Sequence, residues 1–198
     1  MRSVPSWLPL AVILVLAASS VVRIVGLRQA GVNAVALRAG DDAHGFMSRM
    51  FSVLLSTTVI FCLVYAVRPA THATLGPLAW PGQEIVAWIG AALAIAGTAL
   101  AVVAQFGMGR SWRIGFREGD ESALVSDGLY RFSRNPIYVG MMGAMIGIFL
   151  TVPNAVTLTL LIAIWITTSV QIRLEEEFLS RRHGAAYEGY RARTRRWL

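Results

Sequence analysis

The stretch Ile137–Ile172, IYVGMMGAMIGIFLTVPNAVTLTLLIAIWITTSVQI, decides the fold of this chain. It contains two apolar runs, Ile137–Thr151 and Ala155–Ile172, separated by a connection that holds Pro153 and Asn154. At about 1.5 Å of rise per residue, helices of this length approach the thickness of a bilayer's hydrocarbon core. Because the connection is so short, the stretch predicts an antiparallel helical hairpin inside a membrane.

Three further apolar runs precede the hairpin: Trp7–Val25, Phe46–Val67 and Glu84–Phe106. The first has no Ala-x-Ala-like cleavage site close to its end, so we expect a retained span and not a removed signal peptide. The third is rich in Ala and Gly, which let helices approach closely. Between the second and the third, residues 68–82 are expected to form a short loop. The sequence therefore predicts an all-α, polytopic membrane bundle of about five transmembrane helices, in one domain over residues 1–198.

The composition supports a membrane protein and argues against other classes. The chain is 56% hydrophobic and 15% charged, and its mean hydropathy of +0.58 is too high for an ordinary soluble domain. No nucleic-acid motif accompanies the net charge of +7, so no nucleic-acid partner is expected. The one cysteine, Cys62, lies in an apolar run, and we interpret it as a packing residue. His44, His72 and His183 are scattered, and we expect no metal site.

The arginines predict the orientation in the membrane. All 18 basic residues are Arg. With the N-terminus outside, only Arg2 and Arg68 fall outside, and the other sixteen lie at or near the opposite face, as the positive-inside rule requires of the cytoplasmic side. The loop between the third and fourth spans and the C-terminal segment then share the cytoplasmic side. Because the composition is typical of bacteria, we expect a multi-pass protein of a bacterial inner membrane.

The loop before the hairpin carries a first cluster of candidate residues. Trp112 and Arg113 lie among small residues, and the segment 124–130, LVSDGLY, is expected to be extended and to enter a turn at Asp127-Gly128. Asn135 suits the N-cap of the next helix and Pro136 its first position, which is also how an ordinary helix start would look. Tyr130, Arg134 and Tyr138, spaced by four, add aromatic and cationic groups, so the loop can wrap a ligand.

A second cluster lies where the last apolar run ends. On a helix, Arg173, Glu176 and Glu177 are expected to fall in one stripe, whereas Glu175 is expected to point away. Three consecutive carboxylates near a helix C-terminus oppose the helix dipole, and a cationic ligand would offset that cost. The alternative is a surface pair of Arg173 with Glu177 on a solvated helix end, which would contribute little.

Together these motifs resemble the isoprenylcysteine carboxyl methyltransferase and phospholipid methyltransferase superfamily. The resemblance rests on Leu-Val-x-x-Gly-x-Tyr, Arg-Asn-Pro-x-Tyr-x-Gly, Arg-x-Glu-Glu-Glu and the segment from His183 to Arg193, and it covers residues 109–198. It implies an integral membrane methyltransferase that uses S-adenosylmethionine and releases S-adenosylhomocysteine. The cofactor pocket would be roofed by the cytoplasmic loop and the C-terminal helix. Residues 107–198 would form the catalytic core, and residues 1–106 the three N-terminal spans.

The resemblance also implies roles for individual residues. Arg173 would contact the substrate and act in catalysis with Glu176, and Trp112 and Arg113 would shape the same cavity. The family commonly has His where this chain has Asn135, which can hydrogen-bond but cannot serve as a base near neutral pH. The cofactor would be lined by Leu124, Val125, Gly128, Tyr130, Asn135, Pro136, Tyr138 and Glu177.

The acceptor is expected to be hydrophobic, either lipid-like or prenylated, and to enter laterally between the spans. A carboxylate held by Arg173 is already nucleophilic, so positioning and electrostatics suffice, as in isoprenylcysteine carboxyl O-methylation. The amine of a phospholipid would instead need a proton acceptor, for which Glu176 is the candidate. Two other readings remain: an NADPH-dependent sterol or enone reductase, a class that usually has more spans, and a non-enzymatic scaffold, which leaves both clusters unexplained. The sequence specifies no oligomeric state.

Overall fold

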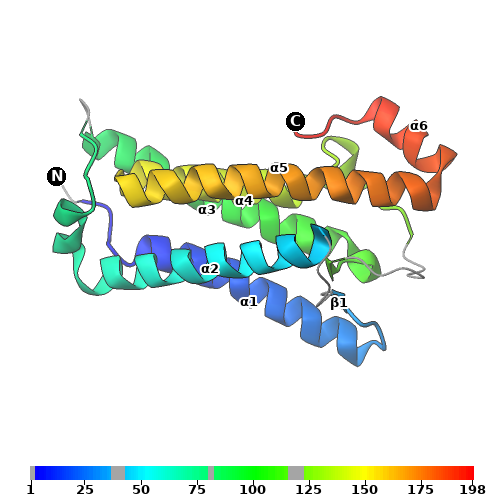
Figure 1. Ribbon diagram of the computed structural model, residues 1–198, viewed down its shortest axis with the longest axis horizontal. Helices are drawn as coiled ribbons and strands as arrows, with labels where there is room; N and C mark the ends of the chain where they lie inside the picture. The colour runs from blue at the N-terminus through cyan, green and yellow to red at the C-terminus, as the bar shows by residue number, and fades with distance from the viewer. Residues whose placement is uncertain (1–2, 37–42, 80–82, 116–122) are drawn as a thin grey trace.

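The computed structural model describes residues 3–36, 43–79, 83–115 and 123–198. Its long helices lie side by side as a bundle, with a short helix beyond one end (Figure 1). The α-helices are α1 (Leu8–Gln29), α2 (Ala43–Val67), α3 (Gln83–Gly107), α4 (Pro136–Thr151), α5 (Ala155–His183) and α6 (Ala185–Arg193). Three 3₁₀ helices, η1 (Pro69–Thr74), η2 (Gly109–Ser111) and η3 (Gly128–Arg131), and two short parallel strands, β1 (Val35–Ala36) and β2 (Ile114–Gly115), complete the described elements.

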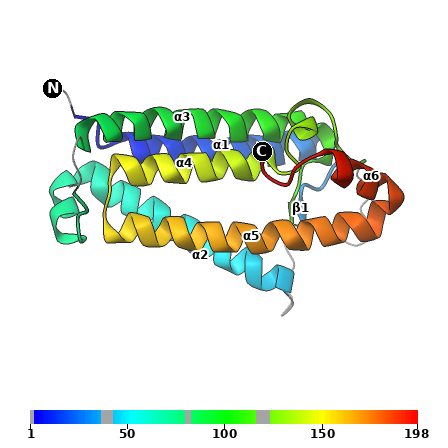
Figure 2. The ribbon, with the colours of Figure 1, turned by 90° about the horizontal axis from the view of Figure 1, so that it is seen from above.

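The prediction of an all-α multi-pass membrane protein is confirmed. Four helices, α1, α2, α3 and α5, are long and apolar enough to cross a membrane. The remaining apolar helix, α4, has 16 residues and runs alongside α5 as the first half of the predicted hairpin (Figure 2). Helix α5 continues past the apolar run to His183 before α6 folds back.

The hairpin turn is fixed by Asn154, whose side chain is fully buried. Its Oδ1 caps α5 by accepting from the backbone N–H of Thr157 at 3.0 Å, and the Thr157 hydroxyl in turn accepts from the Asn154 N–H at 3.1 Å. This reciprocal capping box satisfies two N–H groups at the start of the helix. The segment expected to be a loop after α2 contains η1, which begins at Pro69, and Leu78 N–H from the same connection donates to Pro153 O.

Glycines bring α3 and α4 into close backbone contact. The composition of α3 predicted such a close approach, and the structure identifies α4 as the partner. A Cβ atom on Gly140 would lie 2.5 Å from the backbone nitrogen of Ala101, and one on Gly90 would lie 2.7 Å from the carbonyl oxygen of Gly147. A Cβ on Gly147 would meet the backbone of Ala94 even more closely. Close approach of this kind is how membrane helices gain packing energy without a hydrophobic driving force.

The two motif clusters share one end of the bundle. The N-terminal end of α1, η1 and the hairpin turn lie at one end, whereas β1, η3 and α6 lie at the other (Figure 1). In the strand pair, Val35 is in register with Ile114, so the loop that follows α1 is tied to the loop that follows α3. This arginine-rich end holds the candidate site.

Candidate active site at the arginine-rich end

The three consecutive carboxylates at the end of α5 point in three directions. Successive residues on an α-helix are rotated by about 100°, so neighbours cannot all share one face. Glu175 faces α4, Glu176 is buried beneath the C-terminal segment, and Glu177 is exposed. Glu175 points away from the exposed Arg173 and Glu177, as predicted. The prediction that Glu176 and Glu177 face the same direction is wrong, because Glu176 is buried in contact with Arg134 and Arg196 whereas Glu177 is exposed.

Glu175 is held inside the bundle by two neutral donors. The phenol of Tyr138, in the first turn of α4, donates a hydrogen bond to Glu175 Oε1. The amide of Gln171, one turn earlier on α5, donates to the same oxygen at 3.0 Å. No described residue donates a hydrogen bond to the other oxygen, Oε2. The sequence analysis did not predict a role for Glu175. Its spacing of four residues from Gln171, another polar residue in a largely apolar helix, could have indicated that the two side chains lie on the same face.

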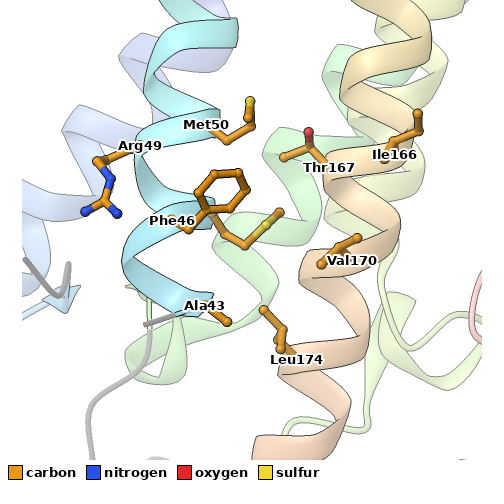
Figure 3. Close-up of a pocket in the computed structure, with 9 residues that line it drawn as sticks. Ala43, Phe46, Arg49, Met50, Ile166, Thr167, Val170 and Leu174 are labelled. Carbon is orange, nitrogen blue, oxygen red and sulfur yellow. The ribbon is translucent and has the colours of Figure 1, made fainter. Parts of the chain in front are cut away.

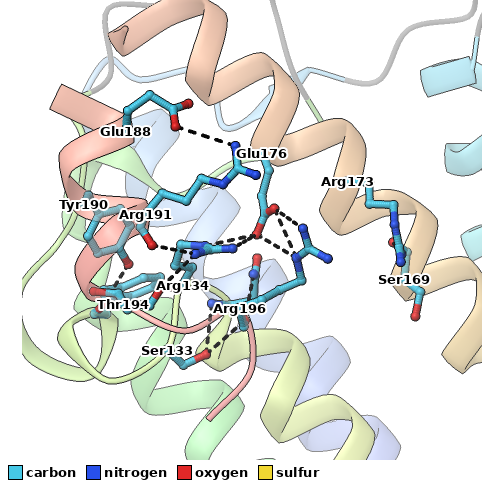
Figure 4. A network of polar contacts seen from close by, with 12 residues as sticks. Ser133, Arg134, Ser169, Arg173, Glu176, Glu188, Tyr190, Arg191, Thr194 and Arg196 are labelled. Atoms are coloured by element: carbon cyan, nitrogen blue, oxygen red, sulfur yellow. Dashed lines mark hydrogen bonds and ion pairs between the residues drawn. The ribbon is translucent and has the colours of Figure 1, made fainter. Parts of the chain in front are cut away.

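Glu176 is the centre of an ion-pair clamp (Figure 4). Arg134 Nη2 donates to Oε1 at 2.9 Å, and Arg196 Nη2 donates to Oε2 at 2.8 Å. Arg134 also donates to the carbonyl oxygens of Thr194 at 2.7 Å and Arg191 at 3.1 Å. Both carboxylate oxygens are therefore engaged by guanidinium groups, and the expectation that Glu176 acts as a proton acceptor conflicts with this geometry. The hydrogen bonds from Arg196 to Glu176 raise the pKa of Arg196.

Arg173 and Glu177 are on the outside of α5. The guanidinium of Arg173 donates to the carbonyl oxygen of Ser169 at 2.7 Å, away from the clamp (Figure 4). Glu177 pairs with Arg181 at 3.7 Å, and 63% of the Glu177 side chain is exposed. A pair this exposed contributes little to stability. The surface ion pair of Arg173 with Glu177, which the sequence analysis gave as an alternative, does not form; Glu177 pairs with Arg181 instead.

Asn135 and Pro136 occupy the predicted positions at the start of α4. Asn135 is the N-cap residue and Pro136 the first residue of the helix. The Asn135 side chain, however, makes no cap hydrogen bond; it is buried and its Nδ2 donates to the carbonyl oxygen of Arg196 at 3.0 Å. Asn135 therefore ties the start of α4 to the C-terminal segment.

Tyr130 lies in η3, close to the same place. Its phenol donates to Ala104 O at 3.3 Å, and its own carbonyl oxygen accepts from the Tyr190 phenol at 2.6 Å. Burial raises the pKa of Tyr130, and the negative charge of Glu175 raises it further. Of the other residues in this segment, Leu124 and Val125 are half-buried, and Gly128 is exposed and begins η3 with a φ of +60°.

Trp112 and Arg113 are placed by α1 and the segment after it. Trp112 is buried in a small apolar cluster with Leu27 and Ala34. Arg113 Nη1 donates to the carbonyl oxygen of Asn33 at 3.3 Å. The partly buried Ile137, next to Tyr138, packs against the same cluster, so the cluster supports the start of α4 through apolar contact.

An apolar groove of about 460 Å³ opens between α2 and α5 (Figure 3). The α5 side carries Ile166, Thr167, Val170 and Leu174, and the last of these lies between Arg173 and Glu175 in the sequence. The groove thus reaches the level of the candidate site. The α2 side is lined by Ala43, Phe46, Met47, Arg49 and Met50.

The model of the family described as phospholipid methyltransferase matches residues 85–186. The chain belongs to this family. The match runs from the beginning of α3 to the first residues of α6 and so includes both motif clusters, as well as a helix that the sequence assigned to the N-terminal spans.

Curated relatives of this family member are isoprenylcysteine methyltransferases. It is 32% identical over 91 residues to a protein-S-isoprenylcysteine O-methyltransferase of Schizosaccharomyces pombe, a match that covers 46% of this chain and 39% of that protein. It is 28% identical over 143 residues to a probable protein-S-isoprenylcysteine O-methyltransferase of Oryza sativa subsp. indica, covering 70% and 74%. The superfamily predicted from the motifs is thereby confirmed.

A solved structure of similar fold supports the architecture of this family member. It is the eukaryotic intramembrane Ras methyltransferase ICMT, with a TM-score of 0.54 and 23% sequence identity. The likeness covers 74% of this chain and 51% of that one, so this chain spans about half the length of the neighbour. The shared part is a multi-pass membrane fold.

Proposed function

We propose that this family member transfers a methyl group from S-adenosylmethionine to a hydrophobic acceptor at the cytoplasmic face of a membrane. The observation that carries the proposal is Glu175, a half-buried carboxylate that faces α4 and whose described hydrogen-bond donors, Tyr138 and Gln171, are both neutral. A carboxylate removed from water is costly unless a cation or strong donors compensate it. A positively charged ligand fits this requirement.

The residues around Glu175 suit such a ligand. S-adenosylmethionine supplies a methyl group on a positively charged sulfonium, and it also carries an ammonium group. Glu175 would bind the positive charge, Gln171 would orient the carboxylate, and the rings of Tyr138 and Tyr130 offer faces that attract cations. Glu175 thereby takes the role that the sequence assigned to Glu177. The resemblance adds Leu124, Val125, Gly128, Asn135 and Pro136 to this site.

The acceptor would use the groove between α2 and α5. Its apolar walls suit a lipid or prenyl chain, and its α5 wall ends at Leu174. Arg173 follows the groove residue Val170 by three positions, so it lies at the same side of α5, one turn beyond. A guanidinium there can bind a carboxylate with two parallel hydrogen bonds. The names of the relatives make an isoprenylcysteine carboxylate the leading acceptor, with Trp112 and Arg113 as supporting residues.

A second candidate acceptor is the amine of a phospholipid, which the description of the family favours. An amine must lose a proton to become a nucleophile. Since both oxygens of Glu176 are held by arginines, Glu175 is the better candidate for that proton. An amine acceptor would therefore depend on Glu175 and be indifferent to Arg173.

The test is ligand stabilisation followed by a substrate screen. The purified protein is heated with S-adenosylmethionine, S-adenosylhomocysteine or NADPH, and a ligand at 100 times its Kd should add about 2.7 kcal/mol of stability. We expect stabilisation by the first two compounds only. Small prenylated thiol-acids and lipid amines are then screened for methyl incorporation. Stabilisation by NADPH alone would support a reductase and overturn the proposal.

A further inference from the structure

The last five residues, Thr194–Leu198, fold back along α5. The Trp197 ring stacks on the Trp165 ring with 5.3 Å between centroids and 11° between planes. Trp165 lies within the apolar run of α5, and 48% of its surface is exposed. Both ribbon views place the end of the chain beside the α4–α5 hairpin and not beyond α6 (Figures 1 and 2).

This segment lies at the level where the spans begin. The hydrogen bond from Asn135 to Arg196 O places Arg196 beside the first turn of α4. Trp197 and Leu198 continue toward the apolar part of the bundle, and Leu198 is 70% exposed. Trp is enriched where a membrane protein crosses the boundary between headgroups and hydrocarbon, because its ring is apolar and its N–H is polar. Contact of Leu198 with lipid would explain why this apolar side chain is exposed.

Cations surround this apolar end. Arg193 and Arg195 are exposed, and a parallel bridge between Ser133 and Arg195 brings Arg131 and Phe132 alongside. The Arg131 guanidinium lies 4.5 Å above the Phe132 ring, which is itself 58% exposed.

Three of the acidic groups in this region are engaged elsewhere, and a fourth, Asp127, is exposed at the start of η3. Glu177 pairs with Arg181, Glu188 pairs with Arg191, and Glu176 is enclosed in the clamp. Among ion pairs within the described ranges, none involves Arg193 or Arg195. The outer surface of the segment therefore carries net positive charge next to apolar side chains.

We propose that Thr194–Leu198, together with Arg131, Phe132 and Arg193, is a binding surface for anionic phospholipid headgroups, which we call the interfacial strap. Its inner side is held by Arg196 and Glu176, and its outer side presents arginines to headgroup phosphates while Trp197 and Leu198 contact the acyl chains. Juxtamembrane arginines attract anionic lipid in this way. The proposal does not depend on which reaction the protein performs.

The depth of the strap is tested first, with the full-length chain in nanodiscs. A fluorophore on Leu198→Cys is compared with one on Ala186→Cys, an exposed position in α6; Cys62 is fully buried and is left unchanged. Lipids that carry a quencher high on the acyl chain should quench the label at 198 strongly and the label at 186 weakly. Equal, weak quenching at both positions would overturn the proposal.

Headgroup preference is tested next, by association of labelled phosphatidylglycerol and phosphatidylcholine. The parent should prefer phosphatidylglycerol, and Arg193→Gln/Arg195→Gln should lose about fivefold of that preference for each arginine. The matched control is Arg181→Gln/Arg191→Gln, which removes the same charge from arginines that are already paired, and it should keep the preference. No preference in the parent, an unchanged preference in the first variant, or equal losses in both variants would overturn the proposal.

Discussion

Arg196 and Glu176 are twenty residues apart in the chain, yet Arg196 Nη2 lies 2.8 Å from Glu176 Oε2 and Arg196 Nε lies 3.1 Å from each carboxylate oxygen. Arg134, from the loop before α4, approaches the same carboxylate. The clamp thus joins α5, the start of α4 and the C-terminal segment, and it places Asn135 and Tyr138 relative to Glu175.

Removing one arm of the clamp should destabilise the protein. Arg196→Gln leaves Glu176 with Arg134 alone, and we expect the free energy of unfolding to fall by about 1.5–3 kcal/mol, the range for hydrogen bonds to charged groups. Arg195→Gln is the control. Because Arg195 is exposed, this substitution should lower the free energy of unfolding by less than about 0.5 kcal/mol. Denaturant titration in mixed micelles measures both. Equal effects would show that the ion pair does not hold the segment.

The glycine contacts of α3 and α4 predict a second difference. Gly147→Ala places a Cβ against the backbone of Ala94, and the resulting overpacking should cost about 1–3 kcal/mol. Gly143→Ala, on the same helix, would put its Cβ 3.4 Å from Gly97 Cα, an ordinary contact, and should be tolerated. Thermal unfolding of the two variants separates packing from helix propensity. A tolerated Gly147→Ala would mean that the helices lie further apart.

Arg173→Lys tests whether this arginine binds an anionic acceptor. Lys keeps the charge but loses the planar fork that a carboxylate can use, so turnover should fall much more than cofactor affinity. Methyl incorporation and donor binding are measured on the same preparation. If the protein methylates amines but not acids, and Arg173→Lys is as active as the parent, the carboxylate model is wrong. Glu175 would then be the residue to test as the proton acceptor.

Labelling of engineered thiols tests the orientation. Thr74→Cys, in η1, and Asp120→Cys, between α3 and α4, should react with an impermeant reagent from opposite sides of the membrane. The prediction rests on the arginine distribution and on α3, the one apolar helix that lies between positions 74 and 120 in the described part of the chain. Labelling of both thiols from the same side would show that the topology is wrong.

The sequence was sufficient for features set by local chemistry. The hairpin followed from Pro153 and Asn154 between two apolar runs, and the start of α4 followed from Asn135 and Pro136. The small residues of α3 predicted that another helix approaches it closely, but they did not predict that this helix is α4. In each case, the physical cause lies within a few residues of the feature, so a single chain segment contains the information.

The directions of the three carboxylates could not be obtained in the same way. Which of them turns inward depends on Arg134, Arg196 and Tyr138, which meet α5 only after the chain has folded back on itself. The groove between α2 and α5 has the same origin, since its walls are far apart in the sequence.

The central claim is that Glu175, and not Glu177, recognises the positively charged methyl donor. Equilibrium binding of S-adenosylmethionine to Glu175→Gln and to Glu177→Gln tests it most directly, because both variants remove one charge from α5 with little change in volume. Loss of a charge-assisted hydrogen bond corresponds to about tenfold or more in Kd. We predict that Glu175→Gln weakens S-adenosylmethionine binding by this factor. The affinity of Glu177→Gln should stay within about twofold of the parent, because Glu177 is exposed and paired with Arg181. Weakened binding in Glu177→Gln with unchanged binding in Glu175→Gln would contradict the account.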